Sequence, residues 1–414
     1  MDTAVDITQL VEREALAARA ALSRLTDERV DRALARTLEL LAERAGEVLA
    51  ANERDLEAAA GTLDAGALDR LRLDPGRLEG IAEGVRATAA LEPIDRDVRS
   101  WTLPNGLEVA ERLIPVGVVG ANFEARPNVA VDVATQVLKS GNAVVLRTGS
   151  AALGTVTVLV DRVLRPALAD AGADGAAVGL VRVPERAGAE ALVSLPALLP
   201  LVILRGSGAS TAALVRIAAA NGVRTLAHAE GGGVLYAHTA ADPERLARLV
   251  RASLDRLGVC NRLNLALADS PELASVVAGV CRELDVEVRG DGGLPLDRPL
   301  GHEWASEPDR VATVTLVVVD GLEEAVRTAN EQTSGLAATI VTEDGAAAER
   351  FLDDYRGTAA LWNATTRFTD GFALLGTPET GINVDRIPGP RGPVTYRDLC
   401  LRQYRIVGDG SQHR

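Results

Sequence analysis

The segment 116–147 opens with Val116-Gly117-Val118-Val119-Gly120 and closes with Ala143-Val144-Val145-Leu146-Arg147. Both stretches read as short, almost wholly apolar strands, and residues 127–139 between them have the pattern of a helix that begins at Pro127. Strands of this kind are buried on both faces, as in a parallel sheet covered by helices. The segment therefore predicts an α/β fold.

The same alternation continues toward the carboxyl terminus and restarts after Gly231-Gly232-Gly233. We place a domain boundary at this glycine triplet and predict two doubly wound parallel-sheet domains. Beyond the opening segment, the expected strands are 178–183, 201–204 and 223–226 before the triplet, and 234–237, 311–319, 337–341 and 359–362 after it. The expected helices are 151–171, one opening at Ser207-Gly208-Ala209-Ser210, 243–257, 322–331 and 345–355.

The segments outside these two domains predict helices and a small β arm. Residues 7–60 and 76–91 have the apolar spacing of amphipathic helices. Residues 98–101 and 107–114 predict a hairpin, because they flank Pro104-Asn105-Gly106 and Asn-Gly is a strong turn signal. A further strand near 403–407 is expected to extend this hairpin or the sheet of a neighbouring subunit.

Composition excludes several functional classes. The net charge of −14 makes binding to nucleic acid improbable. The longest apolar stretch, residues 191–204, is interrupted by Pro196 and Pro200 and is too short to span a membrane. The first residues lack the basic and apolar regions of a signal peptide, and three widely spaced cysteines are typical of a reducing compartment. We therefore expect a cytoplasmic protein.

Among the three cysteines, Cys260 is the candidate nucleophile. It lies between a glycine and an asparagine in Leu257-Gly258-Val259-Cys260-Asn261, where a substrate can reach it and backbone amides can lower its pKa. Cys281 and Cys400 lie in apolar patterns and are expected to be small buried hydrophobes. The local sequence alone favours an inert packing residue at Cys260.

The stretch 114–129 is a second candidate site, because it leads from a strand through a loop into a helix. Such a junction presents free backbone amides and the positive end of the helix dipole to an anion. Arg126 and Asn128 are placed to hydrogen-bond a phosphate or a developing oxyanion. The alternative is a routine strand–helix connection that carries a solvated arginine.

A third candidate follows the strand that ends at Arg147. Gly149 and Ser150 come next, at the carboxyl end of a strand, where open α/β sheets bind nucleotides. Arg205-Gly206-Ser207-Gly208 forms a second small-residue turn before a helix and suits a pyrophosphate or a ribose. The G-x-G-x-x-G fingerprint is absent, and turns of this sort are often purely structural.

Together these motifs resemble the aldehyde dehydrogenase superfamily, and most closely its gamma-glutamyl phosphate reductase branch. The resemblance spans nearly the whole chain in one order. Two of its motifs are specific to this branch, namely Glu-Ala-Arg-Pro-Asn and Thr-Arg-Phe-Thr-Asp-Gly. The matching segments are Phe123-Glu124-Ala125-Arg126-Pro127-Asn128-Val129, Leu138-Lys139-Ser140-Gly141-Asn142-Ala143-Val144, Gly258-Val259-Cys260-Asn261 and Asn363-Ala364-Thr365-Thr366-Arg367-Phe368-Thr369-Asp370-Gly371.

The resemblance implies three structural units. Residues 1–96 and 115–232 would form an NADP-binding domain, and residues 233–382 a catalytic domain with the cysteine nucleophile. Residues 97–114 and 383–414 would form an oligomerisation hairpin and tail, which implies a homodimer or a higher homo-oligomer. NADPH would contact Arg147, Gly149, Ser150, Gly206 and Ser207, and Arg147 would favour NADP by pairing with the 2′-phosphate. Glu307 would steady the nicotinamide ribose; a solvated surface carboxylate is the alternative.

The resemblance also implies a reaction, for which no metal is expected. The thiolate of Cys260 would attack an acyl phosphate, gamma-glutamyl phosphate or a close analogue, and expel phosphate to leave a thioester. Hydride reduction would then yield the semialdehyde, as in proline biosynthesis. Arg126 and Asn128 would act with Cys260 in catalysis, and a glutamate kinase-like enzyme would supply the substrate.

Three departures from the branch leave the acyl group open. Histidines of the branch are absent from Glu230-Gly231-Gly232-Gly233-Val234-Leu235-Tyr236, from Gln332-Thr333-Ser334-Gly335-Leu336-Ala337-Ala338 and from Gly389-Pro390-Arg391-Gly392-Pro393-Val394. A site built for a charged group loses affinity when such partners are missing. A specialised paralogue that acts on a modified acid is therefore a variant of this interpretation.

Two other functions remain as alternatives. The first of these segments resembles the Glu-x-Gly-Gly of ordinary aldehyde dehydrogenases, in which Glu230 would be a general base that activates water. That interpretation predicts NAD(P)-dependent oxidation of an aldehyde without phosphate; a loop carboxylate without a catalytic role is equally compatible with the sequence. A non-catalytic scaffold that keeps the fold is the third hypothesis, and the presence of Cys260 and Arg126 argues against it.

Overall fold

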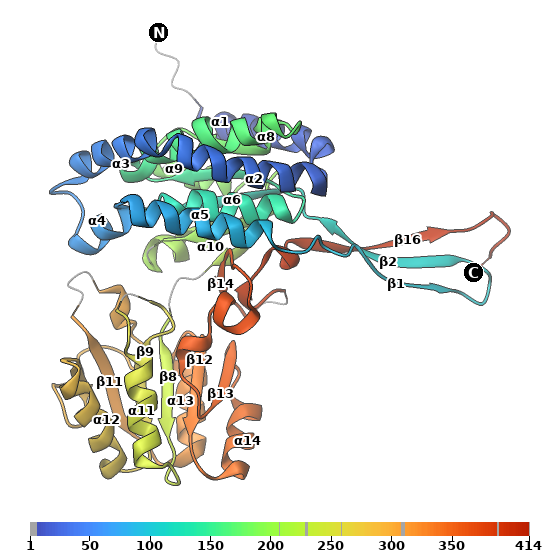
Figure 1. The fold of residues 1–414 in the computed structure, drawn as a ribbon. Helices are drawn as coiled ribbons and strands as arrows, with labels where there is room; N and C mark the ends of the chain where they lie inside the picture. The colour runs from blue at the N-terminus through green and yellow to red at the C-terminus, as the bar shows by residue number, and fades with distance from the viewer. Residues whose placement is uncertain are drawn as a thin grey trace.

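The computed structural model describes residues 6–206, 208–227, 231–257, 259–307, 311–386 and 389–413. Two parallel sheets covered by helices lie one above the other, and a narrow three-stranded arm projects sideways from the region between them (Figure 1). The α/β fold with two parallel-sheet units predicted from the sequence is confirmed. No helix among the described residues is long and apolar enough to cross a membrane.

The first sheet has the order β5-β4-β3-β6-β7, and all its strand pairs are parallel. Every residue of β3 and β4 is buried, which requires cover on both faces. The chain crosses from β3 toward one edge and returns through β6 toward the other, so the order reverses between β3 and β6. The strands are β3 (Val118–Phe123), β4 (Ala143–Thr148), β5 (Val178–Val181), β6 (Leu201–Arg205) and β7 (Arg224–Ala227).

Helices from the amino-terminal part of the chain complete the layers around this sheet. α6 packs against β3 and β4, α1 against β4 and β5, and α10 against β7, while α2, α3 and α5 form an outer layer over α8, α7 and α6. The helices are α1 (Ile7–Ala21), α2 (Asp27–Glu43), α3 (Ala45–Ala59), α4 (Ala65–Leu71), α5 (Pro75–Ala89), α6 (Asn128–Lys139), α7 (Leu153–Val158), α8 (Arg165–Asp170), α9 (Arg186–Leu192) and α10 (Gly208–Asn221).

The second sheet is also parallel and has the order β10-β11-β9-β8-β12-β13. Alternate residues of β8 contribute to two separate cores, Leu235 to one beneath α11 and α12 and Tyr236 to another beneath α13 and α14. The elements are β8 (Gly233–Ala237), α11 (Pro243–Ser253), β9 (Leu263–Ala268), α12 (Pro271–Glu283), β10 (Glu287–Gly290), β11 (Thr313–Val318), α13 (Gly321–Gln332), β12 (Ala337–Val341), α14 (Gly345–Asp354) and β13 (Ala359–Trp362).

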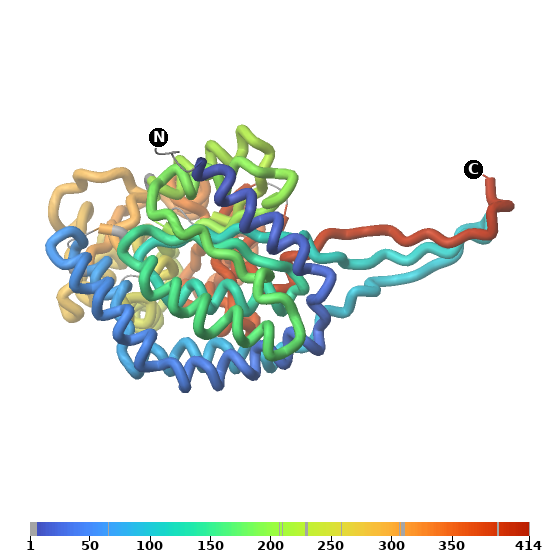
Figure 2. Tube along the Cα trace, turned by 90° about the horizontal axis from the view of Figure 1, so that it is seen from above, coloured from blue at the N-terminus to red at the C-terminus, as the bar shows by residue number. Residues whose placement is uncertain are grey.

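The arm consists of β1 (Asp97–Thr102), β2 (Glu108–Pro115) and β16 (Cys400–Val407), paired antiparallel in the order β1-β2-β16. The tail strand therefore extends the hairpin, as one of the two sequence-based alternatives expected. Seen from above, the arm extends well beyond the helical layers and carries the described carboxyl-terminal residues at its tip (Figure 2). A small sheet of β14 (Gly381–Asn383) and β15 (Gly392–Val394) precedes β16 and lies near β7.

The structure corrects several boundaries predicted from the sequence. The first strand begins at Val118 rather than Val116 and runs to Phe123. The helix expected over 151–171 is split into α7, a π-helical segment over Leu159–Leu164, and α8. Pro166 lies at this second junction and has no N–H to donate, which favours the irregularity.

Other elements were missed. β9, α12 and β10 fill the stretch between Cys260 and residue 291, where no strand had been assigned. β9 is a short apolar run directly after the cysteine loop, and a run of that length does not distinguish a strand from a loop or helix end. Cys281 is buried in α12 as expected, whereas Cys400 starts β16 and is only partly buried.

The start of β8 has no space for a side chain larger than hydrogen at Gly233. A Cβ there would overlap the side chain of Thr366 and lie 3.0 Å from the carbonyl oxygen of Arg262. We expect Gly233→Ala to lower the free energy of unfolding by about 1–3 kcal/mol, measured by denaturant titration. Gly279→Ala in α12 is the control, because a Cβ there meets nothing within 4 Å and should stabilise by about 0.5–1 kcal/mol. Equal stability of the two variants would contradict this packing.

Candidate active site

The carboxyl edge of the first sheet forms one side of the site. β3 leads into Glu124-Ala125-Arg126 and the neighbouring strand β6 leads into Arg205-Gly206, so both loops emerge where the strand order reverses. Ligands of open α/β sheets bind in the crevice at such a point. Ala125 has a φ of 45°, which is costly for a residue with a side chain. This strained turn directs the chain from β3 into α6.

Arg126 is a largely desolvated cation at this edge. Burial, together with the nearby cations Arg205 and Arg70, lowers the pKa of its guanidinium to about 10. A thiolate at Cys260 acts in the opposite direction and raises this pKa, so the two side chains are close enough to interact. The sequence placed Arg126 and Cys260 in separate motifs, and the structure brings them together.

Asn128 is the first residue of α6, one residue after the predicted start, and Pro127 is its N-cap. The amide Nδ2 of Asn128 donates to Oδ2 of Asp132 at 3.0 Å. Burial raises the pKa of Asp132 to about 6, although the bond from Asn128 and the charge of Arg205 lower it. The amide that the sequence assigned to anion binding is therefore held by a buried carboxyl group.

The other side of the site is the amino edge of the second sheet, where the glycine triplet crosses the cysteine loop. The backbone N–H of Gly232 donates to the carbonyl oxygen of Cys260 at 2.7 Å. A Cβ at Gly231 would lie 2.7 Å from Cβ of Cys260 and 2.8 Å from Oε1 of Glu303. Only glycine permits this approach, so the triplet is a packing requirement of the loop that carries the thiol.

The segment Asn363–Gly371 fixes the same loop from the other side. Nδ2 of Asn261 donates to the carbonyl oxygens of Arg367 and Thr369, both at 3.1 Å, and Arg367 donates to Oδ1 of Asn261. The hydroxyl of Thr366 donates to the carbonyl oxygen of Asn261 at 2.8 Å. Two of the motifs that carried the family resemblance therefore form one hydrogen-bonded unit around the residue after Cys260.

Cys260 is partly buried in this setting. It packs against Leu336, Ala337 and Ile382. Burial raises the pKa of its thiol to about 11, and the carboxylates of Glu303 and Glu379 contribute to the rise, while Arg205 opposes it. The sequence suggested that backbone amides could lower this pKa. The backbone hydrogen bond does lower this pKa, but desolvation and two negative charges outweigh the amide and the arginine.

Glu303 is a site residue that sequence reasoning missed. The sequence singled out Glu307 instead, but Oε1 of Glu307 lies 2.7 Å from Nε2 of His302 and 3.9 Å from Arg298. Glu303 flanks Cys260 across Gly231 and is thus better placed beside the thiol. The signal was weak, because His302-Glu303-Trp304 follows a stretch without a clear pattern. The ribose-binding role assigned to Glu307 stays a prediction.

Arg147 lies at the end of β4 as expected, but its guanidinium already has partners. Nη2 donates to the carbonyl oxygens of Pro184 and Glu185 at 2.6 and 3.0 Å, and Nη1 donates to Asn122 at 3.2 Å. The residue is 5% exposed, and burial lowers its pKa. These contacts do not favour direct pairing of Arg147 with a 2′-phosphate.

The remaining cofactor candidates differ in how far the structure describes them. Gly149 and Ser150 begin a 3₁₀ turn after β4, and a Cβ at Gly149 would meet nothing within 4 Å. Gly206 follows β6, next to Glu124, whose Oε1 accepts from Ser210 at 3.0 Å. Ser207 and the candidate base Glu230 lie outside the described residues. No group of three or more potential metal ligands occurs within the described ranges, so nothing there suggests a metal centre.

The effect of Arg205 and Glu379 on Cys260 was also missed. Nη1 of Arg205 donates to the carbonyl oxygen of Thr380 at 3.2 Å, which joins β6 to the segment carrying Glu379. Oε2 of Glu379 accepts from the backbone of Gly371 at 2.8 Å, and burial raises the pKa of this carboxyl to about 7. The sequence placed Arg205 in a small-residue turn suited to a cofactor, and Glu379 has no motif, so only the folded structure relates the two residues to Cys260.

We expect Glu303→Gln to lower the pKa of Cys260, because it removes one of the two carboxylates that raise it. The rate of alkylation by iodoacetamide reports the thiolate fraction, so this variant should react about 3- to 10-fold faster than the parent at pH 8. Glu307→Gln is the matched control, since that carboxylate contacts His302. A larger acceleration in the control variant would show that Glu307, and not Glu303, faces the thiol.

The chain is similar to known proteins in both sequence and fold. The aldehyde dehydrogenase family model matches residues 311–391. A gamma-glutamyl phosphate reductase of Caulobacter sp. strain K31 is 37% identical over 375 residues, which are 88% of each chain. One from Brucella anthropi is 34% identical over 99% of this chain and 98% of its own.

A solved structure shows the same similarity. The gamma-glutamyl phosphate reductase of Thermotoga maritima superposes with a TM-score of 0.90 at 27% identity, covering 98% of this chain and 100% of that one. The two relatives from Caulobacter and Brucella are more than 30% identical to this chain over most of its length and of their own. The similarity therefore includes the sequence as well as the fold. The chain therefore belongs to the gamma-glutamyl phosphate reductase family, within the aldehyde dehydrogenase superfamily.

Proposed function

We propose that this enzyme reduces an acyl phosphate, gamma-glutamyl phosphate or a close analogue, to the semialdehyde with NADPH and releases phosphate, as in proline biosynthesis. The observation that carries the proposal is the meeting of Cys260 with Arg126 and Arg205 between the two sheet edges. A thiol nucleophile beside two cations suits a substrate whose leaving group is a phosphate. The names and identities of the relatives support the same reaction.

The residues at the carboxyl edge of the first sheet fit a dinucleotide. α10 begins two residues after Gly206, and its amino end offers backbone N–H groups to a pyrophosphate. The open space beside Gly149 leaves room next to Ser150 for the adenosine ribose. A bound nicotinamide supplies the hydride that reduces the acyl group. We assign NADPH as the cofactor on the basis of the family. Arg147 would order this edge of the sheet through its hydrogen bonds to the carbonyl oxygens of Pro184 and Glu185.

In the proposed reaction, Sγ of Cys260 bonds to the acyl carbon, and the bond from that carbon to the phosphate oxygen breaks. Inorganic phosphate leaves, and a thioester remains on Cys260. After reduction of the thioester, the C–S bond breaks, the carbonyl of the aldehyde forms, and the thiol is regenerated. Arg126 would bind the phosphate, and Asn128 would donate to the oxyanion through the amide hydrogen not used by Asp132.

The three units of the chain would then have separate tasks. We assign residues 1–96 and 115–232 to NADP binding, residues 233–382 to the nucleophile, and residues 97–114 and 383–414 to assembly. A glutamate kinase-like enzyme would supply the substrate, because an acyl phosphate forms by phosphorylation of a carboxylate. The hydrolytic alternative requires a base that activates water, and its candidate Glu230 lies outside the described residues.

The phosphate requirement separates these two reactions. With NADP and glutamate 5-semialdehyde, the enzyme should form NADPH only when phosphate is present, followed by absorbance at 340 nm, a wavelength specific to the reduced cofactor. Cys260→Ser should lose at least about 10³-fold in activity. Cys281→Ser is the control, because this thiol belongs to α12 and lies in the core rather than at the site. Phosphate-independent turnover would support the hydrolytic reaction, and activity retained in Cys260→Ser would exclude this nucleophile.

We also propose that the arm assembles subunits. One of its faces carries Trp101, Val109, Tyr404 and Ile406, aligned by the strand register, and Ile406 is 59% exposed. Trp101 and Tyr404 contact edge to face across Val109, with ring centroids 6.2 Å apart. An apolar face on a thin projecting sheet has no core of its own and gains by burial against another subunit.

Ile406→Glu should therefore shift the enzyme toward the monomer, measured by sedimentation velocity across a concentration series. The charge would be buried at the interface, which costs several kcal/mol. Ser100→Glu is the matched control, because the alternation along β1 places residue 100 on the opposite face from Trp101. Unchanged assembly of Ile406→Glu would contradict a role for this face.

A further inference from the structure

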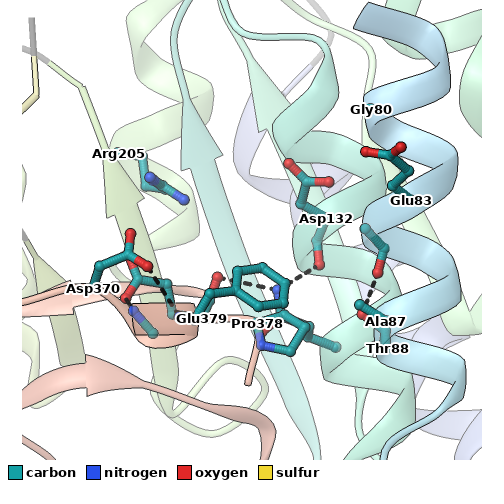
Figure 3. Close-up of a pocket in the computed structure, with 13 residues that line it drawn as sticks. Gly80, Glu83, Ala87, Thr88, Asp132, Arg205, Asp370, Pro378 and Glu379 are labelled. Atoms are coloured by element: carbon teal, nitrogen blue, oxygen red, sulfur yellow. Dashed lines mark hydrogen bonds between the residues drawn. The ribbon is translucent and has the colours of Figure 1, made fainter. Parts of the chain in front are cut away.

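A pocket of about 470 Å³ lies at the end of β6. It lies between helices α5 and α6 on one side and the segment 370–379 on the other, with Arg205 of β6 at one end (Figure 3). Two of its lining residues, Arg205 and Glu379, are close enough to Cys260 to shift the pKa of the thiol. The pocket therefore adjoins the place where an acyl group would be attached.

Carboxyl groups dominate the charge of this pocket. Glu83, Asp132, Asp370 and Glu379 line it, against the single cation Arg205. Arg205 already donates to the carbonyl oxygen of Thr380. Within the part of the chain that the structure describes, none of the four carboxylates forms an ion pair. The carboxylate of Asp370 caps the turn that follows it, because its Oδ1 accepts hydrogen bonds from the backbone N–H groups of Phe372 and Ala373.

Two of these carboxyl groups are costly to ionise without a ligand. Burial raises the pKa of Asp132 to about 6 and that of Glu379 to about 7, even though Arg205 lowers both. A cation bound between them would compensate for the lost hydration of both carboxylates. Figure 3 shows Asp132 and Glu83 projecting from neighbouring helices, with Arg205 across the pocket from Asp132.

Gln136 supplies an independent observation from the same wall. Its side-chain Nε2 donates to the carbonyl oxygens of Asp132 and Glu379, both at 3.1 Å, and this fixes the orientation of the amide. The residue is 2% exposed, and its Oε1 has no hydrogen-bond partner. A buried acceptor without a donor is unfavourable unless a ligand completes it. This wall of the pocket therefore presents an unsatisfied hydrogen-bond acceptor and an excess of negative charge. A ligand that carries both a donor and a positive charge would satisfy both.

The side chains of Leu336 and Ala337 pack near Cys260 from the second sheet and are fully buried, and Glu303 is a carboxylate on the same side. The pocket beside α5, α6 and the segment 370–379 gathers several carboxyl groups around an open volume. We therefore look to this pocket for polar recognition of the substrate.

We propose that this pocket binds a free ammonium group at the end of the acyl substrate remote from the reacting carbonyl, held by Asp132 and Glu379 with Gln136 Oε1 as a further acceptor. This assignment deepens the proposed function and rests on it for the identity of the acyl group. The pocket would exclude substrates whose amine is acylated, since an amide nitrogen carries no charge. Arg205, at one end of the pocket, is the single cation among the described lining residues, and it would bind the carboxylate of the substrate.

The test compares two ligands that differ only in the ammonium group, L-glutamate and glutarate. Calorimetric titration of the full chain at pH 8 should show glutamate binding at least about 10-fold more tightly than glutarate. The preference should weaken from pH 8 to pH 5, because Asp132 and Glu379 take up protons across that range. Equal affinity for the two ligands, or a preference that does not change with pH, would overturn the proposal.

Variants locate the preference. Asp132→Asn and Glu379→Gln should each reduce glutamate affinity about 10- to 100-fold and leave glutarate affinity unchanged. Glu83→Gln, at an exposed helix position, tests the pocket with little risk to folding. Glu79→Gln is the matched control, because its carboxylate lies on the same helix but pairs with Arg86 at the surface. Glutamate preference retained in all three pocket variants would place the ammonium elsewhere.

A kinetic comparison keeps this inference distinct from the proposed function. With NADP and phosphate, kcat/KM should favour glutamate 5-semialdehyde over 5-oxopentanoate, and Asp132→Asn should remove that ratio mainly through KM. If neither aldehyde is oxidised while glutamate still binds selectively, the proposed reaction fails and the ammonium pocket stands. If both aldehydes react equally well, the reaction stands and the pocket assignment fails.

Discussion

The site depends on one backbone contact, the hydrogen bond from the N–H of Gly232 to the carbonyl oxygen of Cys260. It brings the strand leading into β8 against the loop leading into β9, so closely that Gly231 has no space for a Cβ. Asn261 then holds the loop to the segment 363–371. With both flanks of the loop bonded, the position of the thiol follows from the backbone rather than from its own side chain. This arrangement suits a nucleophile that must meet a substrate bound by another sheet.

The electrostatics of the site are unfavourable to a thiolate until ligands arrive. Burial and two carboxylates raise the pKa of Cys260, while Arg205 opposes the rise. The same burial raises the pKa values of Asp132 and Glu379 and lowers that of Arg126. Burial thus disfavours the charged form of each of these groups, and a substrate with complementary charges would offset that cost. Perturbed groups concentrated beside a pocket are typical of functional sites.

Much of the site could be read from short motifs, and the missing part has a common cause. Cys260, Arg126 and Asn128 lie in loops with distinctive neighbours, so the sequence pointed to them and to the α/β frame. Glu303 and Glu379 lie in stretches without a motif and Arg205 lies in a turn assigned to the cofactor, so only the packing of segments distant in the chain relates these three residues to the thiol. The contacts of Arg147 were unforeseen for a related reason: Nη2 donates to the carbonyl groups of Pro184 and Glu185, which are far away in sequence. Its contact with the cofactor stays a prediction.

The sequence by itself determined the alternation of buried strands and helices, the hairpin arm and the candidate thiol, because these follow from local periodicity and turn chemistry. It could not determine which carboxylates surround the thiol or which wall of the site is polar. Those properties depend on burial and on the juxtaposition of a carboxyl edge with an amino edge, and both are set by packing between segments distant in the chain. Tertiary structure alone therefore decided that Cys260 faces apolar side chains on one side and an acidic pocket on the other.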